Sequence, residues 1–151
     1  MKIALIQFNS TVGDCAGNID ALVNYYREAC REGAALAVAS ELALTGYPPQ
    51  DLLFRESFLD LHDRELTRLM TVVGDVGLVI GAVERNPGAG KPLFNSAVLI
   101  RNGKIVARQR KTHLPTYDVF DERRYFLPNK DAIGVFEYDG LRVAMLVCED
   151  M

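Results

Sequence analysis

Short hydrophobic runs alternate with helical repeats through the first half of the chain. The runs Lys2–Phe8, Ala35–Glu41 and Val76–Val83 are typical of strands that are covered on both faces. Between them, apolar side chains recur at helical spacing from Asn18 to Arg31 and from Ser57 to Val73, which predicts two amphipathic helices. The first half therefore predicts strands and helices in alternation.

Turn signals in the second half predict two β-hairpins. Asn102-Gly103 lies within Asn95–Arg108, and Asp139-Gly140 lies within Val135–Val147. Both dipeptides favour the tight turns of hairpins. Together with the first half, they predict an α/β fold whose mixed sheet carries helices on one face. The apolar segment from Leu141 onward is typical of a buried strand, and we expect the domain to be cut short where it ends.

The composition is that of a globular domain and argues against several functions. Of 151 residues, 49% are hydrophobic and 25% are charged, and the net charge is -3. A nucleic-acid surface normally needs a cationic excess, which this chain lacks. No apolar run is long enough to cross a membrane. Met1-Lys2 leads into a strand-like segment instead of a signal peptide, so we expect a cytoplasmic protein. The cysteines Cys15, Cys30 and Cys148 fit neither a disulfide framework nor a zinc site.

Cys148 is a candidate for chemistry because it ends an apolar run and precedes Glu149 and Asp150. A buried structural cysteine is the commoner role for such a residue. A catalytic role requires a thiolate, whereas a free thiol is mostly protonated at neutral pH. The two adjacent carboxylates oppose ionisation of the Cys148 thiol. A base or a cation that favours the thiolate must therefore come from elsewhere in the fold.

Glu41 and Lys111 are the candidate partners, because each lies at the end of a predicted strand. Lys111 could supply a cation and Glu41 a base, although each alone also fits a surface charge. Glu41 lies within an apolar stretch, so we expect its carboxylate to be partly buried and to need a partner. His113 is an alternative base, and we expect His62, which has charged neighbours on a helix, to be exposed.

Three separated motifs carry a resemblance to a known family. They are SELALTGYPPQDLLFRESFL at 40–59, KTHLPTYDVFDERRYF at 111–126 and VCEDM at 147–151. In this order they resemble the nitrilase, or carbon-nitrogen hydrolase, superfamily, and within it the glutamine amidohydrolase domain of glutamine-dependent NAD synthetases. The resemblance implies a nitrilase-like α-β-β-α sandwich with mixed sheets. Residues 1–151 would form the N-terminal part of that domain, truncated after the nucleophile strand.

The resemblance also implies a catalytic set of Glu41, Lys111 and Cys148. In such a set the cysteine forms a thioester, the glutamate transfers protons and activates water, and the lysine stabilises the oxyanion with a backbone N–H. A second glutamate, Glu122, is implied to hold Lys111 and to position the substrate. The residues implied for substrate binding are Tyr117, Glu122 and Phe120.

The implied reaction is hydrolysis of L-glutamine to glutamate and ammonia, which supplies ATP-dependent amidation of nicotinic acid adenine dinucleotide. The hydrolase step needs no cofactor or metal, and ATP and Mg²⁺ are implied only for a synthetase domain. The resemblance further implies a homo-oligomer. A free-standing nitrilase-type amidase and a non-catalytic scaffold remain alternative hypotheses. We expect a molecule that stops at Met151 to be poorly folded or inactive, which circular dichroism and a glutaminase assay would test.

Overall fold

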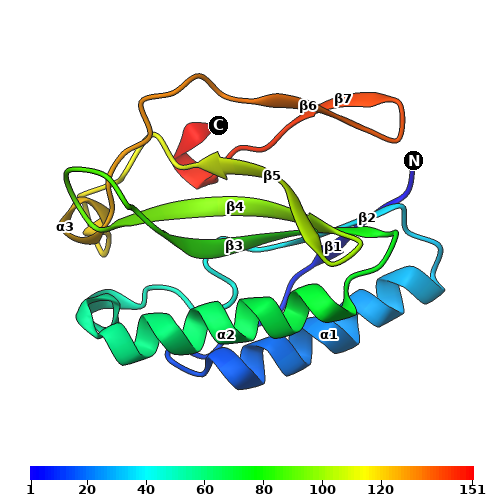
Figure 1. The fold of residues 1–151 in the computed structure, drawn as a ribbon, viewed down its shortest axis with the longest axis horizontal. Coiled ribbons are helices and arrows are strands. Elements are labelled where there is room, and N and C mark those ends of the chain that lie inside the picture. The colour runs from blue at the N-terminus through cyan, green and yellow to red at the C-terminus, as the bar shows by residue number, and fades with distance from the viewer.

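The computed structural model describes residues 1–151 and contains a five-stranded sheet with a helical layer on one face (Figure 1). The strand order is β1-β2-β3-β4-β5. The first three strands pair in parallel, and β3, β4 and β5 pair antiparallel. The mixed α/β sheet predicted from the sequence is confirmed. The strands are β1 (Ile3–Ile6), β2 (Leu36–Ala39), β3 (Gly77–Arg85), β4 (Leu93–Arg101) and β5 (Lys104–Arg110).

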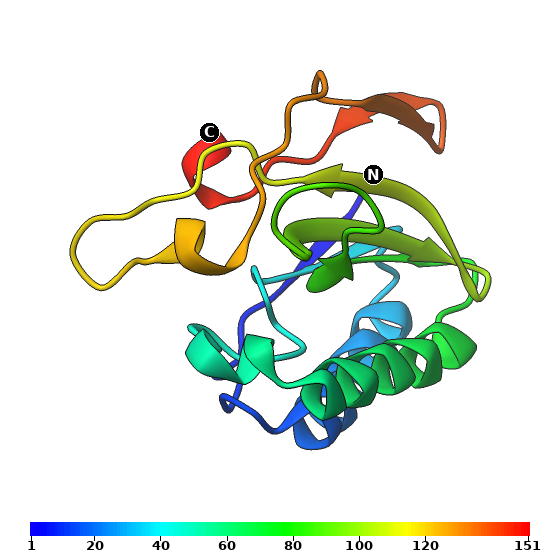
Figure 2. The same ribbon diagram turned by 60° about the vertical axis from the view of Figure 1, so that its left-hand side comes forward.

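Both long helices, α1 (Cys15–Arg31) and α2 (Glu56–Val72), lie side by side against the same face of the sheet (Figures 1 and 2). Their apolar sides form the main core with β3, where Leu22, Leu69 and Leu78 are all fully buried. Each fully buried leucine contributes roughly 1.5–3 kcal/mol relative to an exposed one. The helical layer therefore holds the sheet whose strand ends carry the candidate residues. No helix is long and apolar enough to span a membrane.

Helix α1 begins before the predicted start at Asn18. Asp14 is the N-cap and accepts a hydrogen bond from a backbone N–H in the first turn. Asn18 is instead buried, and its side chain bonds the backbone of Thr11 and the carbonyl of Leu44. Cys15, which precedes the predicted helix, is the first helical residue. Asn18 therefore ties the helix to the turn that follows β2.

A separate hairpin covers part of the face opposite the helices (Figure 2). It consists of β6 (Val135–Tyr138) and β7 (Leu141–Ala144). The Tyr138 hydroxyl accepts a hydrogen bond from the Gly77 N–H and donates one to the Ala35 carbonyl. This buried tyrosine fixes the hairpin to the start of the central strands.

The last segment departs from the predicted buried strand. Strand β7 ends at Ala144, Met145–Val147 have no strand partner, and Cys148–Asp150 form a short 3-10 turn. Strand β7 pairs only with β6, and Leu141 in that strand and Leu146 after it are 47% and 43% exposed. The nucleophile candidate therefore lies after an extended segment, at a turn.

His62 was expected to be exposed, and that prediction is wrong. The residue is fully buried on α2, where Nε2 accepts a hydrogen bond from the Val83 N–H at 3.1 Å. Its Nδ1 lies 2.9 Å from Asp63 Oδ1. Sequence neighbours on a helix point in different directions, so charged neighbours do not predict the exposure of His62. The contact fixes α2 to β3.

Candidate active site

Glu41 lies in the turn at the carboxyl end of β2, and β3 approaches that turn closely. The Gly81 N–H donates to the Ser40 carbonyl at 3.2 Å. A Cβ on Gly81 would lie 2.6 Å from the Glu41 Cα and 2.2 Å from the Leu42 backbone nitrogen. Only glycine allows this approach. The Glu41 side chain is 19% exposed, which agrees with the partial burial expected from its apolar neighbours.

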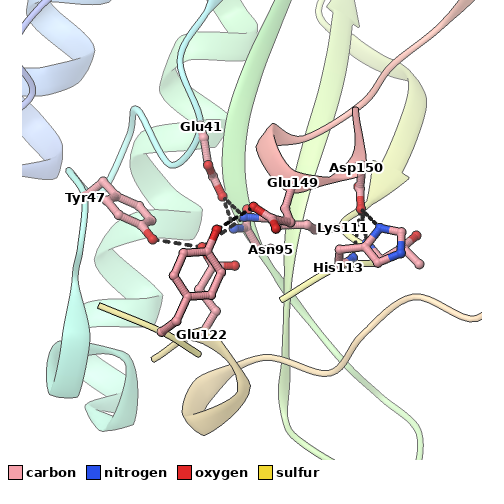
Figure 3. Close-up of polar contacts among 10 residues, drawn as sticks. Glu41, Tyr47, Asn95, Lys111, His113, Glu122, Glu149 and Asp150 are labelled. Carbon is pink, nitrogen blue, oxygen red and sulfur yellow. Dashed lines mark hydrogen bonds and ion pairs between the residues drawn. The ribbon is translucent and has the colours of Figure 1, made fainter. Parts of the chain in front are cut away.

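Lys111 follows β5 and is held on both sides of its backbone. Its N–H donates to the Asn95 carbonyl at 2.8 Å, and its carbonyl accepts from the Asn129 N–H at 2.9 Å. The fully buried side chain places Nζ 2.8 Å from Glu41 Oε1 and 2.9 Å from Glu122 Oε1 (Figure 3). Two carboxylates that are far apart in the sequence, those of Glu41 and Glu122, thus share one ammonium.

Lys111 is held in its charged form. Burial lowers its pKa, but hydrogen bonds to Glu41 and Glu122 outweigh that effect and leave the pKa above the ordinary lysine value. Burial raises the pKa of Glu122, which Lys111 opposes. The Tyr47 hydroxyl donates to Glu122 Oε1 at 2.9 Å, and burial together with this carboxylate raises the pKa of Tyr47. Tyr47 therefore remains a neutral donor beside the charged cluster.

Asn95 belongs to the site, and the sequence analysis did not identify it. It lies on β4, is 1% exposed, and donates through Nδ2 to Glu41 Oε1 at 2.6 Å (Figure 3). Its Oδ1 is buried without a hydrogen-bond partner. The only sequence signal was a polar residue near the start of a strand that is otherwise mostly apolar. Side-chain direction in the folded sheet was needed to connect it with Glu41.

Cys148 starts the short turn with a left-handed backbone, at φ 50°, which is unusual for a residue other than glycine. Cys148 and Glu41 line the same hollow, of about 330 Å³, on the sheet face opposite the helices. Burial and the Glu41 carboxylate raise the pKa of the Cys148 thiol, while Lys111 lowers it. The Glu41 carboxylate thus lies close enough to the thiol to raise its pKa, and it is placed to take the thiol proton.

The carboxylate of Asp150 is buried and engaged by the segment after Lys111. Its side chain is 1% exposed, and it accepts hydrogen bonds from the N–H groups of Thr112 at 3.0 Å and His113 at 2.8 Å (Figure 3). His113 Nδ1 lies 3.2 Å from the same carboxylate. His113, the alternative base, thus contacts Asp150, and Asp150 ties the Cys148 turn to the segment after Lys111.

The loop between Lys111 and α3 (Glu122–Tyr125) supplies an aromatic wall. The Tyr117 hydroxyl donates to Glu149 Oε2 at 2.9 Å, although Tyr117 is 56% exposed. The ring of Phe120 lies 5.6 Å from that of Tyr117 and 6.1 Å from that of Tyr47. This places Tyr117 beside the turn that carries Cys148, and Phe120 packs against Tyr117.

The assembled groups suit the hydrolysis of an amide. A thiol, a carboxylate beside it and a buried ammonium can serve as nucleophile, proton carrier and oxyanion partner. No group of three or more histidine, cysteine, aspartate or glutamate side chains is placed to hold a metal ion.

The relatives of this chain include glutamine-dependent NAD synthetases. A glutamine-dependent NAD(+) synthetase of Xanthomonas campestris pv. campestris is 37% identical over 153 residues, which cover 100% of this chain. The match covers 27% of that synthetase, so the chain spans about a quarter of its length.

Solved structures with the same fold include a glutamine-dependent NAD+ synthetase and an amidase. The glutamine-dependent NAD+ synthetase of Acinetobacter baumannii has a TM-score of 0.86 and 32% identity, over 98% of this chain and 27% of that one. An amidase from Nesterenkonia sp. has a TM-score of 0.86 and 26% identity, over 99% of this chain and 56% of that one. The family model described as Carbon-nitrogen hydrolase matches residues 2–151. The chain belongs to the carbon-nitrogen hydrolase family.

Proposed function

We propose that this chain is the N-terminal part of a glutamine amidohydrolase domain that hydrolyses L-glutamine to glutamate and ammonia. The observation that carries the proposal is the buried Lys111 ammonium, held between Glu41 and Glu122 next to the hollow that Cys148 lines. Membership of the family and similarity to glutamine-dependent NAD synthetases support this choice of substrate.

The proposed reaction begins with transfer of the Cys148 proton to Glu41. The thiolate attacks the side-chain amide carbon, and Lys111 with a backbone N–H after Cys148 stabilises the oxyanion. Glu41 then gives this proton to the departing ammonia. A thioester remains on Cys148. Glu41 then activates a water that releases glutamate, and the thiol is restored. General acid–base catalysis of this kind contributes about 10²- to 10⁴-fold.

Substrate recognition is proposed for the loop after Lys111. Glutamine carries an α-ammonium group, and Glu149, oriented by the Tyr117 hydroxyl next to Cys148, offers a carboxylate that suits it. Phe120 packs against Tyr117 and limits its movement. Glu122 positions Lys111 and is proposed to contact the substrate as well.

We also propose that the ammonia is passed to a synthetase module that amidates nicotinic acid adenine dinucleotide with ATP and Mg²⁺. No residue of this chain is assigned to ATP or Mg²⁺. A cytoplasmic homo-oligomer is the expected form. The second candidate is a free-standing amidase acting on another small amide, which the match to the Nesterenkonia amidase favours.

The test compares nitrogen donors in the full-length protein that carries this sequence. Cys148→Ala should abolish NAD synthesis from glutamine and preserve synthesis from ammonium. Cys30→Ala, at the partly exposed cysteine of α1, is the control and should preserve both. Loss of both activities in Cys148→Ala, or of neither, contradicts the proposal. Hydrolysis of other amides without glutamine hydrolysis would favour the free-standing amidase.

A further inference from the structure

Two donors converge on a single oxygen of the Glu41 carboxylate. Oε1 accepts hydrogen bonds from Asn95 Nδ2 at 2.6 Å and from Lys111 Nζ at 2.8 Å (Figure 3). Neither donor reaches Oε2. A carboxylate oxygen has two lone pairs for acceptance, so these donors occupy Oε1 and leave Oε2 for a proton.

The orientation of Asn95 is set by charge and has a cost. With Nδ2 toward Glu41, its Oδ1 is buried and has no partner. The opposite orientation would set an amide oxygen against the carboxylate, which is repulsive. An unsatisfied buried acceptor destabilises a fold by about 1–3 kcal/mol, so its presence in a native structure calls for an explanation.

Asn95 also fixes the residue that supplies the second donor. Its carbonyl accepts the Lys111 N–H at 2.8 Å, next to the end of the β4–β5 ladder. One residue therefore aligns the backbone that carries Lys111 and restrains the Glu41 carboxylate. Because Asn95 lies on a strand that is buried on both faces, it cannot follow movements of Glu41.

We propose that Asn95 is a positioning residue that selects Oε2 of Glu41 as the oxygen that exchanges protons with the reaction. The proton of the Cys148 thiol passes to Oε2 as the sulfur attacks the amide carbon, and it passes from Oε2 to the leaving ammonia. Asn95 touches neither substrate nor thiol in this scheme and acts through Glu41. The proposal rests on the proposed amide hydrolysis but not on glutamine being the amide.

The chain offers a matched control at the next position. Ser96 is fully buried on the same strand, and its hydroxyl donates to Glu84 Oε2 at 3.0 Å. Glu84 also pairs with Arg110, at 2.6 Å, outside the candidate site. Ser96→Ala therefore removes a buried donor to a carboxylate without altering Glu41.

The experiment uses Asn95→Leu and Asn95→Thr in the full-length protein. Leucine keeps the volume and removes both the donor and the unpartnered oxygen; threonine keeps a hydroxyl too short to replace the amide. Amide hydrolysis is followed from acid to alkaline pH, with glutamine and with other small amides. Thermal unfolding and the rate at which iodoacetamide alkylates Cys148, read by peptide mass spectrometry, are measured in parallel.

Loss of one hydrogen bond to a charged group predicts a fall in kcat of about 10- to 100-fold in both Asn95 variants, with KM changed less than about threefold. The acid limb of the pH profile moves to higher pH, because the Glu41 carboxylate has lost a donor that stabilises its charge. The pH midpoint for alkylation of Cys148 also differs from that of the wild type. Ser96→Ala leaves the pH profile of activity and the pH profile of alkylation unchanged.

Unchanged pH profiles, or Asn95 variants that lose activity only in proportion to lost folded protein, would overturn the proposal. If Asn95→Leu does not fold, Asn95→Thr and its alkylation profile decide the same question. If the wild type does not hydrolyse glutamine but the Cys148 alkylation profile still shifts in the Asn95 variants, the proposed substrate fails and the role of Asn95 stands.

Discussion

Gly81 lies against the backbone of Glu41 so closely that a Cβ would come within 2.6 Å of the Glu41 Cα. Gly81→Ala is therefore expected to push the carboxylate away from Lys111. A displacement of about 1 Å costs roughly 10²-fold in rate, and overpacking costs about 1–3 kcal/mol in stability. The checks are kcat for amide hydrolysis and the free energy of unfolding.

Gly74→Ala is the control for Gly81→Ala. Nothing lies within 4 Å of a Cβ built on Gly74, so this variant should keep its activity and stability. Full activity in Gly81→Ala would show that the close contact with Glu41 does not position the carboxylate.

Removal of the Lys111 ammonium is expected to destabilise the protein. Lys111→Met leaves Glu41 and Glu122 without their shared cation, and breaking a buried ion pair costs about 3–5 kcal/mol. Lys104→Met, at the exposed start of β5, is the control and should change stability little. Urea unfolding at neutral pH measures the difference, and equal stabilities would contradict the expected role.

The stabilisation from Lys111 has a defined pH dependence. Its folded-state pKa is raised by Glu41 and Glu122, so its contribution is complete below the unfolded-state pKa and is lost as pH rises through the folded-state pKa. The difference in unfolding free energy between wild type and Lys111→Met should be largest at neutral pH and shrink in the alkaline range. A difference that grows with alkaline pH would be inconsistent with a buried ammonium.

The reactivity of Cys148 should report the carboxylate beside it. Burial and Glu41 raise the pKa of the thiol, so Glu41→Gln should lower that pKa. The pH midpoint for alkylation of Cys148 by iodoacetamide should then move to lower pH. Glu149→Gln, whose carboxylate is engaged by Tyr117, should move the midpoint less. A midpoint that rises in Glu41→Gln would exclude this arrangement.

Asp150 is expected to hold the turn that presents Cys148. Asp150→Ala leaves the N–H groups of Thr112 and His113 without their acceptor, which predicts a loss of about 1–3 kcal/mol in stability and a lower kcat. Asp150→Asn keeps one acceptor oxygen and should lose less. Asp121→Ala is the control, because Asp121 makes no side-chain cap bond. Equal kcat values in all variants would contradict the role of Asp150.

The sequence predicted those parts of the molecule that depend on local patterns. The hairpin turn at Asn102-Gly103 and the strand that leads to Glu41 follow from turn chemistry and hydrophobic runs. The start of α1 was misplaced because Asp14 and Asn18 are both good caps, and the choice depends on the contact of Asn18 with Leu44. A contact across the fold cannot be read from a local window.

The candidate site, too, has parts that the sequence predicts and parts that depend on contacts across the fold. The roles of Glu41, Lys111 and Cys148 came from motif resemblance, whereas their convergence depends on the sheet and on the close approach of Gly81. Asn95 was missed because only its inward direction on β4 links it to Glu41. Pairings between distant side chains are set by topology and register, which hydrophobic periodicity does not specify.

The most direct measurement is covalent labelling of the full-length protein by an electrophilic glutamine analogue, with the modified residue located by peptide mass spectrometry. We predict a single adduct on Cys148, formed more slowly when excess glutamine is present. Absence of labelling on Cys148, or labelling of Cys30 at the same rate, would contradict it.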